Sequence, residues 1–96
     1  MIIELKKFGQ TLTSREEGRE AFAAFKPTLN IISDRESVEI VFTDVNTLSP
    51  SWADEFLTPL FKQFGKRLIL KETDNLSVST TLSTLEKVHQ IKFVRN

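Results

Sequence analysis

The chain contains no cysteine, and this absence removes several classes of site. Disulfide frameworks, thiolate zinc sites and cysteine nucleophiles all require a thiol. A surplus of charge is missing as well, because 13 Lys and Arg residues balance 13 Asp and Glu residues. A nucleic-acid binder is expected to carry a basic excess that neutralises phosphates. We therefore expect neither DNA nor RNA as a partner.

Long apolar runs are also absent. The longest uninterrupted runs span a few residues, far below the roughly 20 that a helix needs to cross a bilayer. At the amino terminus Ile2 and Ile3 are followed by Glu4, which interrupts any apolar segment of a secretory signal. These features predict no association with a membrane and a cytoplasmic location.

The composition that remains is typical of a soluble globular domain. The chain has 96 residues, of which 40% are hydrophobic and 27% are charged. A chain of this length has room for one hydrophobic core. We therefore expect one domain over residues 1–96.

The spacing of apolar residues predicts strands that alternate with helices. Strands are expected at 2–7, 38–42 and 68–70, helices from 14, over 49–64 and over 78–88, and a short edge strand near 91–94. Ser14 and Glu17 form a capping box at the start of the first helix. Pro27 is expected to end or bend this helix, although Leu29, Ile31 and Ile32 suggest a further turn packed against the core.

The second helix has the clearest pattern. Ser49 precedes Pro50, which favours the first position of a helix, and an apolar residue recurs every four positions thereafter. These apolar residues are Trp52, Phe56, Leu60 and Phe64. Pro59 interrupts the pattern and predicts a kink there, and Gly65 is expected to end the helix.

This order of elements predicts an α/β fold, with a mostly parallel or mixed sheet of about four strands and helices packed on its surfaces. The apolar run from Val38 to Phe42 favours a central strand that is covered on both faces. In such folds ligands and partners meet the loops at the carboxyl ends of the strands. Segments 43–52 and 72–77 are therefore the expected location of a functional site.

Two motifs in this chain resemble a known family. Residues 42–56 join an apolar strand, an Asp-Val step and a serine-containing turn to a helix that begins Trp-Ala-Asp-Glu, and residues 13–18 read Thr-Ser-Arg-Glu-Glu-Gly. Both are similar to the bacterial STAS-like domains, which are relatives of the anti-sigma-factor antagonists. The resemblance implies a small STAS-like fold and a regulatory role in which the domain binds another protein.

In the antagonist branch, a serine at this turn is phosphorylated by a histidine-kinase-like ATPase, and Ser51 stands at the matching position. A phosphate at a helix N-terminus is favoured by the helix dipole and adds charge that can expel a partner. Ser49, Pro50 and Trp52 differ from the antagonist motif, and an aromatic residue at the position of Trp52 is common in the STAS-like branch. The resemblance therefore implies Ser51 as a possible phosphoacceptor and an ATPase as a possible partner.

The residues that the resemblance assigns to partner binding each have a simpler interpretation. They are Thr47, Ser49, Ser51, Trp52, Asp54 and Glu55. Ser49 and Ser51 are sufficiently explained as helix caps, with Ser51 and Asp54 as a variant of the capping box. Trp52 is either a core residue, which its spacing favours, or an exposed docking residue. Asp54 and Glu55 are adjacent, so we expect them to point in different directions on a solvated helix face.

No catalytic or metal-binding constellation emerges from the remaining residues. His89 is the only histidine and is expected near the end of the third helix, half-buried or stabilised by the helix dipole. The hydroxyl-rich stretch 77–84 is explained by capping and a solvated helix face. We therefore expect no catalytic residues, no metal and no cofactor.

The leading hypothesis is a non-enzymatic regulatory module that binds a protein partner through residues 47–55. The alternatives are a phosphoacceptor switch at Ser51 and a nucleotide-binding domain that uses the strand-end loops.

Overall fold

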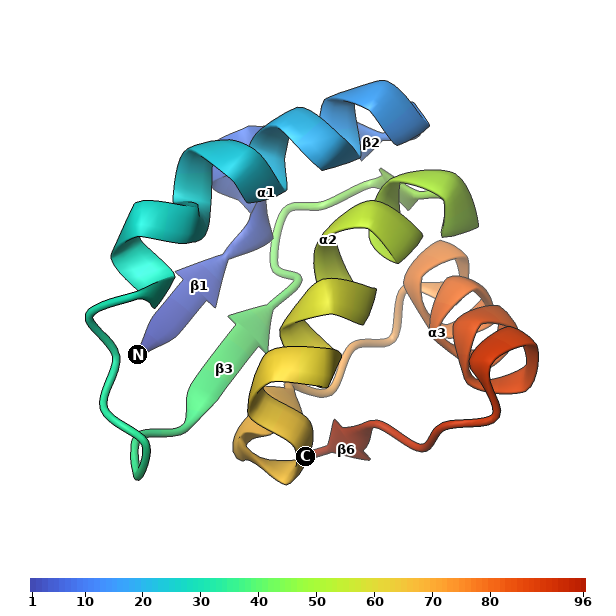
Figure 1. Ribbon diagram of the computed structural model, residues 1–96. Helices are drawn as coiled ribbons and strands as arrows, with labels where there is room; N and C mark the ends of the chain where they lie inside the picture. The colour runs from blue at the N-terminus through green and yellow to red at the C-terminus, as the bar shows by residue number, and fades with distance from the viewer.

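A computed structural model describes all residues from 1 to 96 and contains an α/β domain (Figure 1). Its strands are β1 (Ile2–Glu4), β2 (Thr11–Leu12), β3 (Val38–Val41), β4 (Thr47–Leu48), β5 (Leu68–Leu70) and β6 (Val94–Arg95). Its α-helices are α1 (Arg15–Leu29), α2 (Pro50–Phe64) and α3 (Leu76–His89). Two 3-10 helices, η1 (Leu5–Phe8) and η2 (Gly65–Arg67), complete the elements.

The main sheet has four parallel strands in the order β1-β3-β5-β6, which confirms the expected sheet of about four strands. This spatial order follows the order of the chain. Because crossovers between parallel strands are right-handed, helices that connect strands added in one direction lie on the same face of the sheet. The three α-helices accordingly form one layer in front of the sheet (Figure 1).

The expectation that β3 is covered on both faces was wrong. Side chains alternate along a strand, so each strand here has one buried set and one set that the helices do not cover. Val38 and Ile40 are buried beneath the helices, whereas Glu39 and Val41 are only half-buried on the other face. An apolar run in the sequence does not reveal that the crossovers leave one face of the sheet open.

A second, two-stranded sheet was not predicted. In it β2 pairs in parallel with β4, and Thr11 and Leu12 lie opposite Thr47 and Leu48. Strands of two residues are too short to show a hydrophobic period. The expected strand over 2–7 is correspondingly shorter, because β1 ends at Glu4 and η1 follows.

Helix α1 begins as expected, with the Ser14 hydroxyl accepting a hydrogen bond of 3.0 Å from the backbone N–H of Glu17. Pro27 does not end it at that position, because the helix continues to Leu29. The missing proline N–H falls in the last turn, where it interrupts little of the hydrogen-bond ladder. The expected further turn in the core is wrong for Ile31, which is 82% exposed.

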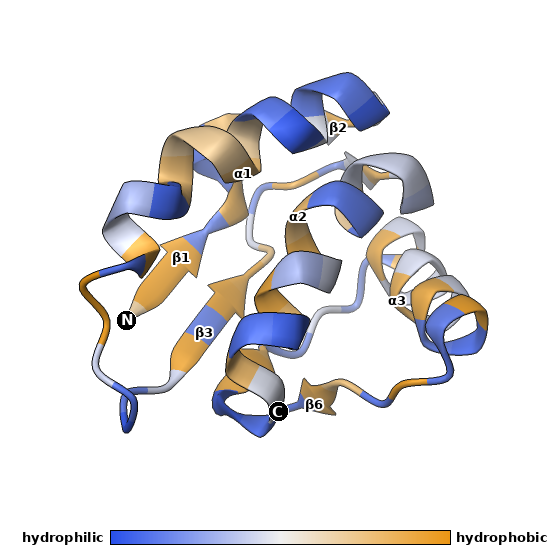
Figure 2. Cartoon of the chain, viewed as in Figure 1, coloured by the Kyte–Doolittle hydropathy of each residue, from blue (hydrophilic) through white to orange (hydrophobic).

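Helix α2 confirms the predicted aromatic stripe. Trp52, Phe56 and Phe64 are buried, and the rings of Trp52 and Phe56 stack with centroids 5.1 Å apart. The helix is continuous through Pro59 and ends before Gly65, which has a φ of 57°. Figure 2 shows polar residues on the outward side of this helix.

Helix α3 buries Val78, Leu82 and Leu85, as predicted. Val88, which was expected to continue this apolar stripe, is instead 67% exposed. The chain then leaves the helix at Gln90, in the left-handed conformation, and adds β6 to the edge of the sheet. No helix of the chain combines the length and the apolar character that a membrane span requires.

Candidate functional site

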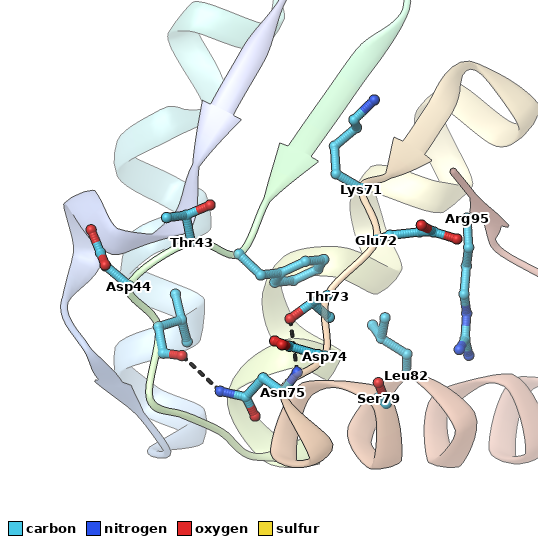
Figure 3. A pocket seen from close by; sticks show the side chains of 12 residues that line it. Thr43, Asp44, Lys71, Glu72, Thr73, Asp74, Asn75, Ser79, Leu82 and Arg95 are labelled. Carbon is cyan, nitrogen blue, oxygen red and sulfur yellow. Dashed lines mark hydrogen bonds between the residues drawn. The ribbon is translucent and has the colours of Figure 1, made fainter.

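The two segments expected to carry function border one pocket at the carboxyl end of the parallel sheet (Figure 3). Its volume is about 850 Å³. It is lined by Phe42, Thr43, Asp44, Val45, Lys71, Glu72, Thr73, Asp74, Asn75, Ser79, Leu82 and Arg95. Adjacent parallel strands end at the same edge, so the loops after β3 and β5 meet here with the start of α3.

The charges around this pocket are unevenly compensated. Lys71 lies 3.5 Å from Glu39, and Arg95 lies 2.7 Å from Glu86. Each of these two cations therefore has an anionic partner that does not line the pocket. Glu72 and Asp74 make no ion pair and are exposed. The free charge at this rim is consequently negative.

The start of α3 holds the loop between β3 and β4 in place. Asn75 caps α3 by accepting a hydrogen bond from the backbone N–H of Val78. Its side-chain amide also donates to the carbonyl oxygens of Val45 and Asn46, at 2.9 and 3.1 Å. One asparagine thus fixes both a helix start and the loop that leads to β4.

Two hydroxyls of α3 extend this attachment to β4. The Ser77 hydroxyl accepts a hydrogen bond of 3.1 Å from the backbone N–H of Leu48, and the buried Thr81 hydroxyl donates to the carbonyl oxygen of the same residue. The prediction that the hydroxyl-rich stretch only caps the helix and faces solvent was therefore wrong for these two residues. Their partners lie about thirty positions away in the sequence, where no local pattern could indicate them.

The turn from β4 into α2 carries the residues assigned to partner binding. Thr47 is exposed, and Ser49 is the N-cap, whose hydroxyl accepts from the N–H of Trp52 at 3.2 Å and donates to the carbonyl of Thr13 at 2.7 Å. Ser51 is the second residue of the helix, half-buried, and its hydroxyl makes no hydrogen bond within the chain. The cap interpretation therefore holds for Ser49 but not for Ser51.

Trp52 belongs to the core, which is the interpretation its spacing favours. Its side chain is 1% exposed and lies beside the rings of Phe8 and Phe56. Its backbone also lies close to α1 at Gly18, where an added Cβ would be 2.5 Å from the carbonyl oxygen of Trp52. The indole offers no free surface to a partner in this conformation.

The expectation that Asp54 and Glu55 form only a solvated helix face was wrong. Both carboxylates converge on the Arg15 guanidinium, with Nη1 lying 3.1 Å from Asp54 Oδ2 and 2.7 Å from Glu55 Oε2. Arg19 adds a second bond to Glu55, at 3.1 Å. Adjacent helix positions diverge at Cβ, but a guanidinium carries several donors and can bridge the two side chains.

His89 completes this network from the end of α3. Its Nε2 lies 2.6 Å from Asp54 Oδ1, which also accepts a bond of 2.9 Å from the Thr58 hydroxyl. Partial burial by itself would raise the pKa of Asp54, but the hydrogen bonds from His89, Arg15 and Thr58 outweigh it and hold this pKa below its usual range. The expectation of a half-buried histidine is confirmed, whereas its acidic partner was missed.

No three His, Asp or Glu side chains are placed together as a metal site would require. Comparison of the chain with models of protein families, with curated proteins and with solved structures found no match.

Proposed function

We propose that this protein is a non-enzymatic regulatory module that binds a partner protein through residues 47–55. The proposed partner is a histidine-kinase-like ATPase, on the basis of the resemblance of residues 13–18 and 42–56 to STAS-like domains. The proposal assigns recognition to the polar positions of the turn and of the first turns of α2, of which Thr47 is exposed and Ser49, Ser51, Asp54 and Glu55 are half-buried. Trp52 supports this surface from beneath and is not itself a contact residue.

One observation carries this proposal: the turn has exposed residues at Thr47 and Pro50 and is yet held from two sides. Asn75 and Ser77 attach its approach to α3, and Ser49 attaches the start of α2 to Thr13. Binding a partner costs less conformational entropy when the recognition surface is already ordered. A small turn held in this way is suited to presenting a fixed surface to another protein.

The experiment is to purify the tagged protein from its own cells, identify the bound protein and measure its affinity for variants of the turn. Thr47→Arg places a large cation on the exposed turn and should weaken binding at least about tenfold. Lys62→Glu changes an exposed residue near the other end of α2 and should leave the affinity unchanged. Equal loss with both variants, or with neither, would contradict the proposed surface.

A second candidate, a phosphoacceptor switch, is favoured by the position of Ser51. Residues 51, 54 and 55 share one helix face, so a phosphate on Ser51 would lie near two carboxylates and the guanidinium of Arg15. The added charge would repel the carboxylates and compete for that guanidinium. Such a change would alter both the charge and the side-chain arrangement of the proposed binding surface.

Ser51→Asp and Ser51→Ala separate a switch from a merely structural serine. If Ser51 is a switch, aspartate should weaken partner binding far more than alanine, while both variants stay folded. Equal binding by wild type, aspartate and alanine variants, together with no phosphate on Ser51 after incubation with the ATPase and ATP, would show that no switch exists there.

The proposal includes the absence of enzymatic activity. The free carboxylates Glu72 and Asp74 at the pocket rim disfavour an anionic nucleotide, so the nucleotide-binding alternative receives no support from the charges there. Purified protein should neither bind ATP or GTP in calorimetry nor hydrolyse them. Turnover that survives repurification and is lost with a substitution in the pocket would overturn this part of the proposal.

A further inference from the structure

We draw no further inference here: the strongest candidate, the face of the main sheet that α1, α2 and α3 leave uncovered, carries none because its Glu39–Lys71 ion pair is satisfied within one chain and nothing in the structure shows what covers it.

Discussion

Asp54 and His89 lie 35 positions apart in the sequence, yet Nε2 of His89 is 2.6 Å from Oδ1 of Asp54. The other oxygen of the same carboxylate accepts a hydrogen bond from Arg15. One side chain of α2 is therefore bonded both to the start of α1 and to the end of α3. This arrangement makes the packing of the helix layer dependent on the ionisation of Asp54.

Acid should destabilise the fold partly through this carboxylate. The pKa values of Asp54 and Glu55 are both lowered in the folded state, Glu55 by its hydrogen bonds to Arg19 and Arg15. A lowered pKa contributes stability above the unfolded value of about 4, and this contribution is lost as the pH falls through the lower folded value. Urea midpoints should therefore be steady near neutrality and should decrease below about pH 4.

Asp54→Asn is the matched variant for this acid dependence. It keeps the size of the side chain but removes the group whose ionisation matters, so its urea midpoint should depend less on pH than that of the wild type. Asp34→Asn changes a carboxylate with no ion pair and should preserve the wild-type dependence. Identical pH profiles for the wild type and Asp54→Asn would show that the network does not contribute.

Gly18→Ala should destabilise the domain, because α1 and α2 approach too closely for a Cβ at this position. That atom would lie 2.5 Å from the carbonyl oxygen of Trp52 and 3.0 Å from its Cα. Both are backbone atoms, so no rotamer change can relieve the overlap. We expect the overlap to lower the free energy of unfolding, measured in urea, by about 1–3 kcal/mol. The higher helix propensity of alanine acts in the opposite direction and contributes about 1 kcal/mol. Glu20→Ala, at an exposed position of the same helix, should have a small effect, and a Gly18→Ala protein as stable as the wild type would refute the close contact.

Phe56→Ala should cause the largest loss of stability among these variants. The ring is fully buried and contacts the rings of Trp52, Phe8 and Phe25. Truncation of a buried phenylalanine costs about 3–5 kcal/mol, a large part of the stability of a small domain. Denaturant unfolding monitored by the fluorescence of Trp52 measures this directly, and an unchanged midpoint would mean that α2 does not bury this face.

Asn75→Ala should loosen the loop that leads to the proposed binding surface. It removes the cap of α3, which is worth about 0.5–2 kcal/mol, and the two bonds to the loop carbonyls. Hydrogen exchange should become faster for the amides of residues 45–48, where the loop and β4 are attached. Ser83→Ala, on the exposed side of α3, serves as the control. Unchanged exchange in this segment would show that the asparagine does not hold the loop.

The sequence by itself determined the elements that depend on interactions between residues close together in the chain. Ser14, Ser49 and the four-residue spacing of Trp52 and Phe56 indicate where α1 and α2 begin and which side of α2 is buried, because caps and helical period act within a few residues. The same reasoning predicted a mostly parallel sheet and placed the candidate site at the carboxyl ends of its strands. A pocket lies there, between the loops after β3 and β5.

Only the tertiary structure decided which residues act together and which surfaces stay open. Arg15, Asp54 and His89 come from three different helices, and Asn75 reaches a loop 29 positions away. Such contacts depend on how the helices pack against one another. The hydrophobic periodicity of the sequence does not reveal that packing. The open face of the sheet has the same origin: an apolar run shows that a strand is buried on at least one side, but the hand and order of the crossovers decide whether the second side is covered.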